Sequence, residues 1–283
     1  MDTKNESELA GVRWDELSIP QMPKVVTKLQ ELTADPESSI QAVVAVVESD
    51  PGLASKCLRL ANSAIYGLRS PAASLRHAAS VLGMRAIRDL AMQTTVAGAY
   101  EHLRAFRKFD LELFWKHSAA TAAAARRLAR YSRLMGTIDF DAIAACGLLH
   151  NIGRLAMLEA FKKEYIDVIV PAGSFGESAL ECERDAFGFD HAAAGAHLAR
   201  AWKLSFDMIA SARDHHGSFD KVSPMAALVG LSNLVAHAAL QNGERGVTTV
   251  LTSPEASLFG VPPESHGKIV EGIVASLREN VFA

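Results

Sequence analysis

The chain of 283 residues has few cysteines, few aromatic residues and no long apolar run. Its three cysteines form no Cys-x-x-Cys pair and cannot all be paired, which argues against a small disulfide-stabilised secreted domain. The longest nearly apolar stretch, residues 225–240, is interrupted by Ser232, Asn233 and His237, and it falls short of the ~18 residues that a membrane span needs. The polar, acidic first ten residues do not read as a signal peptide. We therefore expect a cytoplasmic protein with reduced thiols and no membrane span.

What the chain has in abundance is alanine: 47 residues, against 7% aromatics. Alanine is the best helix former and is depleted in strands, so the composition predicts an all-α fold. Ser38 or Ser39 and the pair Asp50-Pro51 are typical helix starts. A helical run after residue 141 is expected to kink near Gly153. Apolar periodicity predicts further helices over residues 75–82, 84–96, 111–131, 177–187, 191–202, 206–215, 225–240 and 268–279.

Charge is unevenly distributed along the chain, although the formal net charge is only −3. Residues 51–133 carry fourteen Lys and Arg against four Asp and Glu, whereas the segments on either side are acidic. Such a basic block could hold a nucleic acid or an anionic nucleotide. It lacks the aromatic side chains that stack on bases, and this favours solvated helix faces or pairing with the acidic flanks.

The histidines fall at informative places. His117 shares a helix face with Ala124 and Leu128, because offsets of seven and eleven residues return to within about 20° of the same direction. His191 begins another apolar stripe, His150 ends an apolar run, and His215-His216 close a predicted helix. These imidazoles could converge on one pocket, and imidazole is the commonest metal ligand. The alternative is that each is a core or cap histidine that is hydrogen-bonded to a nearby carbonyl.

The order of these residues resembles the HD superfamily of metal-dependent phosphohydrolases, and the framing sequence is closer still to the HDOD (HD-related output domain) family. The residues that carry the HD resemblance are His117, His150-Asn151, His191, His215-His216 and Ser232-Asn233-Leu234. The segments that resemble the HDOD family are Ile19–Pro23, Asp50–Leu53, Leu58–Ala64, Leu75–Ala78, Trp115–Ser118, Gly147–Leu155 and Gly188–His191. The resemblance covers about residues 18–240.

The resemblance implies an N-terminal helical subdomain packed on a C-terminal HD-like helical bundle. We expect a polar tail over residues 1–17, the N-terminal HDOD subdomain over 18–105 and the HD-like subdomain over 106–283. It also implies bacterial signal transduction. The expected partners are other signalling proteins on separate chains: a response regulator, a sensor kinase or a cyclic-dinucleotide enzyme.

Two departures from the HD pattern bear on function. Where a metal-binding HD enzyme carries Asp, this chain has Asn151 and Asn233. An amide offers a neutral oxygen and an NH₂ group, whereas Mg²⁺ and Mn²⁺ prefer carboxylate oxygens, and an activated water needs the metal. We therefore expect no catalytic residues and no catalytic metal. The histidines left behind could hold Zn²⁺ or Ni²⁺, form a hydrogen-bond network or bind a small anion.

Three functions follow, and the first is favoured: a non-catalytic HDOD output module that acts through protein–protein interaction. The alternative is a metal-dependent phosphohydrolase or cyclic-dinucleotide phosphodiesterase with an atypical metal set. A nucleic-acid-binding regulator is the third. It is disfavoured because residues 75–96, which look like a helix-turn-helix, place Asp89 where that motif packs an apolar residue. Asn62 either bridges helices through its amide or lies in a ligand groove between the subdomains.

Overall fold

The computed structural model describes residue 17, residues 21–172 and residues 177–278, so the expected polar tail lies almost entirely outside the described residues. Every regular element within them is a helix. The N-terminal helices are α1 (Lys24–Ala34), α2 (Ile40–Glu48), α3 (Pro51–Ala61), α4 (Leu75–Leu82), α5 (Met84–Ala99) and the 3₁₀ helix η2 (Glu101–Ala105). The remaining helices are α6 (Leu111–Tyr131), α7 (Ile143–Leu149), α8 (Ile152–Ala172), α9 (Glu177–Phe187), α10 (His191–Ala201), α11 (Phe206–Asp214), α12 (Pro224–Leu251), α13 (Pro254–Ser257), η3 (Pro263–Ser265) and α14 (His266–Arg278).

Side-chain caps account for many of the helix starts. Ser39, rather than Ser38, accepts a hydrogen bond from the backbone N–H of Ala42, and Asp50 accepts from Gly52 and Leu53. Each such bond satisfies a backbone donor that has no partner within the helix, which stabilises the start by about 1 kcal/mol. Asp110 and Asp190 cap α6 and α10 in the same way. These two caps set where the helices that carry His117 and His191 begin.

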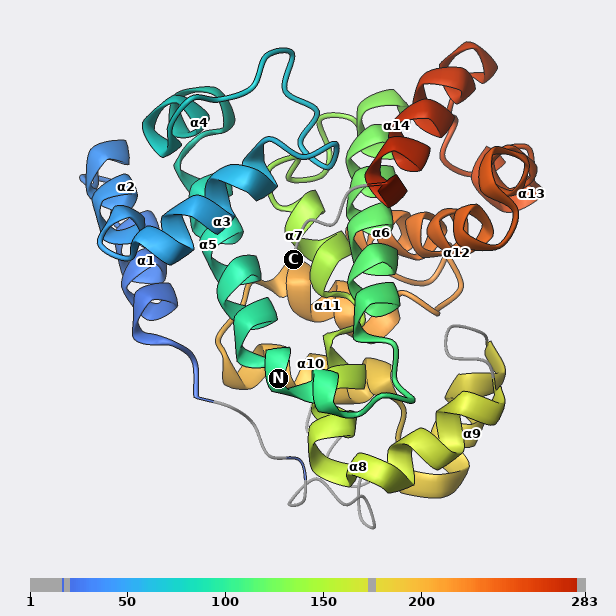
Figure 1. Ribbon diagram of the computed structural model, residues 1–283. Helices are drawn as coiled ribbons and strands as arrows, with labels where there is room; N and C mark the ends of the chain where they lie inside the picture. Colours follow the sequence, from blue (N-terminus) through green and yellow to red (C-terminus); the bar gives the residue numbers. More distant parts are fainter. Residues whose placement is uncertain (1–16, 18–20, 173–176, 279–283) are drawn as a thin grey trace.

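Helix α6 is the centre of the molecule (Figure 1). Helices α7, α12 and α14 pack against it, while α8, α10 and α11 pack in sequence beyond them. Helices α1 to α5 form a group of their own on one side of α6 and α7, and α5 contacts α7. The fold is therefore all-α, with the N-terminal helices packed on a C-terminal helical bundle, as the sequence predicts.

Two hydrophobic clusters fill the interior. The larger joins α6 to α8, α10 to α12 and α14, and the smaller joins α2 to α5. The smaller cluster also contains Ala119, Ala122 and Ala123 of α6, which are fully or nearly fully buried. Small side chains allow close packing: a Cβ on Gly147 of α7 would lie 2.8 Å from the Cα of Ala122. The alanine-rich stretch of α6 is thus where the N-terminal helices and α7 approach it.

The break expected near Gly153 is present, because the run of residues 142–161 is divided at residues 150–151, between α7 and α8. Helix α8 has a further kink at Lys162. Lys162 has φ 49° and ψ −117°, outside the helical region, whereas Gly153 lies in the first turn of the helix. Gly153 serves another purpose, because a Cβ there would lie 1.9 Å from the carbonyl oxygen of His191 and 2.4 Å from the nitrogen of Gly195. Its missing side chain allows α8 and α10 to cross almost backbone to backbone.

Among the described residues, no helix combines the length and apolar character needed to cross a membrane.

Asp89 of α5 is buried at 1% exposure and pairs with the neighbouring Arg88, whose Nε donates to its carboxylate at 2.7 Å. Burial raises the pKa of Asp89 to about 6, although the charge of Arg88 acts in the opposite direction. Ion pairing thus allows a carboxylate at a position where a helix-turn-helix would pack an apolar side chain.

Candidate histidine cluster

The structure brings together five imidazoles that are far apart in the sequence. His117 comes from α6, His150 follows α7, His191 opens α10, and His215 and His216 follow α11. Ring centroids lie 5.6 Å apart for His117–His150, 4.8 Å for His150–His215, 5.6 Å for His191–His215 and 4.1 Å for His215–His216. We call these five residues the histidine cluster. All except His216 are almost completely buried.

Asn233 of α12 lies between the first two rings. Its Oδ1 is 2.8 Å from Nε2 of His117 and 3.2 Å from Nε2 of His150. Nδ1 of His150 lies 2.7 Å from the carbonyl oxygen of Gly147, which can only accept, so a neutral His150 carries its proton on Nδ1. Nε2 then carries a lone pair and can only accept. The Asn233 amide satisfies it when its oxygen and nitrogen exchange positions, so that the NH₂ group donates to Nε2. A carboxylate in this place could only accept.

The other three rings meet on the far side of His150. Nε2 of His191 and Nε2 of His216 are 3.2 Å apart, and the ligand atoms of His191, His215 and His216 all lie within 4.8 Å of one another. Nδ1 of His215 faces the carbonyl oxygens of Ser211 and Ala212, both at 3.0 Å. This arrangement places the proton of His215 on Nδ1. Its Nε2 has no hydrogen-bond partner in the described part of the chain.

Glu183 of α9 orients His191. Its Oε2 accepts hydrogen bonds from the backbone N–H of His191 at 2.8 Å and from Nδ1 of the ring at 2.6 Å. Its Oε1 accepts from the hydroxyl of Tyr165 at 2.7 Å and lies 3.9 Å from a guanidinium nitrogen of Arg154. These four side chains are 0–1% exposed. A carboxylate that holds Nδ1–H of an imidazole directs the Nε2 lone pair away from itself, as partners of metal-bound histidines do.

Sequence reasoning did not select Glu183, Tyr165 or Arg154. A signal for Glu183 was present, because it stands in an apolar stripe of α9 between Leu180 and Phe187, both buried. A carboxylate in the apolar face of a helix must find partners within the core. Nothing in the sequence says which partners those are.

Burial lowers the pKa of every ring in the cluster. The pKa of His150 falls to about 4, mainly by burial, and that of His216 falls to about 4 by burial and by the charge of Arg154. The pKa values of His117, His191 and His215 lie well below the usual range, again mainly because of burial and then because of neighbouring positive groups. The rings are therefore neutral near pH 7, which is the form that binds metal ions.

The donor set fits one kind of metal and not another. His191 and His215 each have Nδ1 directed at an acceptor, so their Nε2 atoms carry lone pairs, whereas Nε2 of His150 contacts the Asn233 amide. His191, His215 and His216 are the three residues whose ligand atoms lie close enough together to share an ion. Two nitrogens bound to one tetrahedral ion lie about 3.3–3.4 Å apart, close to the 3.2 Å between His191 and His216. These residues fit a single ion that accepts nitrogen ligands, such as Zn²⁺ or Ni²⁺. They do not fit a pair of hard cations, because Asn151 and Asn233 are uncharged and Glu183 holds His191, Tyr165 and Arg154.

The two remaining candidate residues form none of the hydrogen bonds described above. Asn151 is 2% exposed, and its side-chain oxygen has no hydrogen-bond partner among the described residues. Asn62 follows α3, and its amide bonds the backbone of Ala72 in both directions: Nδ2 donates to the carbonyl at 3.0 Å, and Oδ1 accepts from the N–H at 2.6 Å. Both polar ends of Asn62 therefore tie the end of α3 to the segment before α4.

The model of the HDOD domain matches residues 19–218, which are most of the chain. The chain belongs to the HDOD family. A curated protein of Treponema pallidum (strain Nichols), described only as uncharacterized, is 26% identical over 223 residues. The match covers 76% of this chain but 42% of that protein, so this HDOD chain spans less than half of that relative's length.

Solved structures share the fold. A protein of Shewanella amazonensis SB2B, provisionally named a phosphohydrolase, has a TM-score of 0.74 at 22% identity, with both chains covered completely. An HDOD domain protein of unknown function from Geobacter sulfurreducens has a TM-score of 0.68 at 20% identity, covering 97% of this chain and 96% of that one. A protein of Marinobacter aquaeolei VT8, provisionally named for signal transduction, has the same TM-score and identity and covers 96% and 63%. At these identities the likeness shows the all-helical fold and nothing finer.

Proposed function

We propose that this HDOD protein is a non-catalytic signalling module that acts by binding other proteins. The observation that carries the proposal is the pair of amides, Asn151 and Asn233, at the two positions where an HD enzyme needs carboxylates. Asn233 sits within hydrogen-bond distance of His117 and His150 and brings no charge to the cluster. Without a negative ligand a hard cation is weakly held, and a water molecule keeps its usual, high pKa.

The cluster then has a structural role in this proposal. Buried hydrogen bonds between elements fix the arrangement of the elements that carry them. Here Asn233 joins α12 to α6 and to the residue after α7, and Glu183 joins α9 to α8 and α10. The proposed partners are a response regulator, a sensor kinase or a cyclic-dinucleotide enzyme on a separate chain. Support for them is the family itself and the name of the Marinobacter protein.

The test has two arms. In the first, the purified protein is assayed against a phosphomonoester, a phosphodiester and cyclic dinucleotides with added Mn²⁺, Ni²⁺ or Zn²⁺, and we expect no turnover above that of a His150→Ala variant. In the second, the tagged protein is recovered from its native cells, and its partners are identified by mass spectrometry and confirmed with purified components. Metal-dependent turnover that His150→Ala abolishes would overturn the proposal, and so would the absence of any partner that binds the purified protein.

A second candidate function is a phosphohydrolase with an atypical metal set. What favours it is the group formed by His191, His215 and His216, whose ligand atoms lie within 4.8 Å of one another, together with the name of the Shewanella protein. In this reading the histidines would hold Zn²⁺ or Ni²⁺, and the ion would supply an acidified water. Metal analysis of protein purified without chelator separates the readings. Bound metal without turnover leaves a structural ion, whereas turnover in proportion to bound metal supports an enzyme.

A nucleic-acid-binding function has less support. Arg85 and Arg88 are the residues of α5 that would contact phosphates in a helix-turn-helix. Arg85 lies 3.4 Å from the carboxylate of Asp139, and Arg88 pairs with Asp89. Because these charges are engaged within the chain, they offer less attraction to a phosphate backbone.

A further inference from the structure

Part of the basic block gathers around a cleft that the histidine cluster does not use. Two adjoining cavities of about 110 and 570 Å³ share the residues Tyr66, Gly67, Arg126, Arg130 and Phe140. The walls come from the segment between α3 and α4, from the C-terminal half of α6 and from the segment before α7; Lys268 of α14 completes the smaller cavity. We call this the basic cleft. It takes residues from both the 18–105 and the 106–283 parts of the chain.

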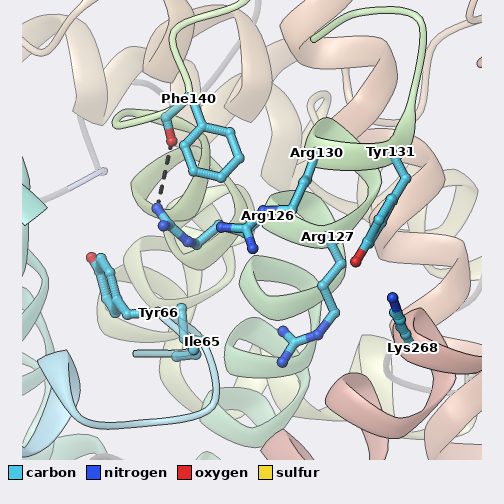
Figure 2. Close-up of a pocket in the computed structure, with 9 residues that line it drawn as sticks. Ile65, Tyr66, Arg126, Arg127, Arg130, Tyr131, Phe140 and Lys268 are labelled. Carbon is cyan, nitrogen blue, oxygen red and sulfur yellow. Dashed lines mark hydrogen bonds between the residues drawn. The ribbon is translucent and has the colours of Figure 1, made fainter. Parts of the chain in front are cut away.

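Arg126 is the central feature of the basic cleft (Figure 2). The residue is 8% exposed, and its guanidinium lies 5.0 Å from the ring centre of Tyr66 and 4.6 Å from that of Phe140. Its one hydrogen bond, to the carbonyl oxygen of Phe140, is long at 3.5 Å. Over the described ranges, no carboxylate lies within 4.0 Å of it. A buried cation is normally paired with an anion, whereas Arg126 forms no ion pair within the described residues, and Asp141 acts on it only from beyond that distance.

The surrounding charges make the imbalance larger. Arg130 is exposed, lies one helical turn beyond Arg126 and has its guanidinium 5.7 Å from the ring centre of Phe140. Like charges four residues apart on a helix repel each other. The guanidinium of Arg127 is held by the carbonyl oxygens of Ala64 and Ala123, at 3.0 and 3.2 Å. Against these, Asp141 is the one acidic residue among the lining residues of the two cavities.

The cleft is separate from the histidine cluster. Arg126 follows His117 by nine residues on the same helix, which places the two side chains on opposite faces of α6. His117 faces α12, whereas Arg126 faces Tyr66 and Phe140. A molecule bound in the basic cleft would therefore not contact the histidine cluster. Binding in the cleft does not depend on whether the cluster holds a metal ion or has activity.

We propose that the basic cleft binds a small phosphorylated molecule of the nucleoside phosphate class. Guanidinium groups are rigid forks that match phosphate oxygens, and Arg126 and Arg130 supply two of them. A cavity of about 570 Å³ is within the range of small-molecule sites and is hollow rather than a flat face that tracks a nucleic-acid backbone. The rings of Tyr66 and Phe140 line both cavities and that of Tyr131 lines the smaller one, so an aromatic base has apolar neighbours there. Binding would join the segment after α3 to α6 and α14.

Isothermal titration calorimetry of the whole chain at low salt tests this. The probes are inorganic pyrophosphate, ATP, adenosine and a short DNA duplex. We expect pyrophosphate and ATP to bind, ATP more tightly, while adenosine gives no heat because the phosphate contacts dominate. Arg130→Gln, an exposed substitution with little effect on folding, weakens binding by on the order of tenfold or more. Arg126→Met, which keeps an apolar stem between the two rings, weakens it at least as much.

The matched control is Arg107→Gln, which removes an exposed positive charge from the same basic block but outside the cleft. It should leave the affinity unchanged, and circular dichroism with thermal melting shows whether each variant is folded. If Arg126→Met does not fold, Arg130→Gln decides alone. Three outcomes would overturn the proposal: no heat from either phosphate, equal losses in Arg107→Gln and Arg130→Gln, or tighter binding of the DNA duplex than of ATP through the same arginines.

Discussion

Nε2 of His191 and Nε2 of His216 lie 3.2 Å apart, although 25 residues separate them in the chain. Glu183 fixes the ring of His191 through Nδ1, and among the described residues no carboxylate joins His191, His215 and His216 as a possible metal ligand. The cluster therefore has nitrogen donors in position and lacks the negative charge that a hard cation requires. The first prediction concerns that missing charge.

Restoring both carboxylates should create a site for Mn²⁺. In a variant with Asn151→Asp and Asn233→Asp, two anionic oxygens join the neutral imidazoles, and the affinity for Mn²⁺ should rise by on the order of a hundredfold over wild type. Titration calorimetry with Mn²⁺ measures the change. Asn242→Asp, at an exposed position of α12, adds a charge outside the cluster and is the control. Equal affinities in the three proteins would show that the amides are not what excludes the ion.

Removing Glu183 should strongly destabilise the fold. Glu183→Ala leaves the buried Arg154 without its counter-charge and takes away the acceptor of Tyr165 and His191. Loss of one partner from a buried charged network typically costs about 3–5 kcal/mol. The comparison is Glu181→Ala on the exposed side of the same helix, which we expect to change the free energy of unfolding by less than about 0.5 kcal/mol. Urea denaturation of both variants decides the matter; similar losses would contradict a network role for Glu183.

The surroundings of two glycines predict opposite effects when each is replaced by alanine. The first lies at the crossing of α8 and α10, and the second is a control in α5. Gly153→Ala places a Cβ 1.9 Å from the carbonyl oxygen of His191, so the two backbones must separate, and we expect a loss of about 3 kcal/mol or more. Gly98→Ala lies in α5 with open space around it, and it should stabilise the protein by about 0.5–1 kcal/mol through helix propensity. Thermal melting measures both. A Gly153→Ala variant as stable as wild type would refute the close crossing.

Asp89 predicts a specific dependence of stability on pH. Its carboxyl has a pKa of about 6 in the folded protein against 3.8 when unperturbed, because burial disfavours its charged form. The folded state thus binds the proton more tightly, and stability declines as the pH rises from about 4 to about 6, by about 3 kcal/mol in all. Asp89→Asn removes the titration. The free energy of unfolding of the variant minus that of wild type should therefore increase by about 3 kcal/mol between pH 4 and pH 7, as measured by urea denaturation. If the difference in the free energy of unfolding does not change with pH, the carboxyl of Asp89 does not have a raised pKa.

The helices could largely be predicted from the sequence, because their signals are local. Residues 111–131 and 177–187 were expected with the bounds that the structure has, and an Asp cap and apolar periodicity are sufficient to define the first of them. Local signals also located the breaks approximately. The run expected to kink near Gly153 divides at residues 150–151, and the helix expected to end near residue 240 is interrupted by a non-helical residue at Gly243 before it continues to Leu251. What they do not show is that the backbone of α10 keeps Gly153 small.

The candidate site shows the same division. Periodicity predicts that His117 and His191 face inward, and the order of motifs indicates the family. Both can be predicted because they depend only on the spacing and order of residues in the sequence. Which ring meets which is a different matter: His150 lies against His215, and Glu183 supports His191 while also holding Arg154. The unpaired charge of Arg126 is likewise invisible in a sequence that has acidic residues nearby.

The helical character of the chain, the HDOD order of its motifs and the amides at positions 151 and 233 can all be read from the amino-acid sequence. The folded chain adds what no sequence shows: five imidazoles share one buried space, a carboxylate from α9 orients one of them, and an arginine on the opposite face of α6 forms no ion pair within the described residues. Separation along the chain explains the difference. Helix formation and capping depend on residues within about four positions of one another, whereas burial, proton position and ion pairing depend on neighbours that come together only when the whole chain folds.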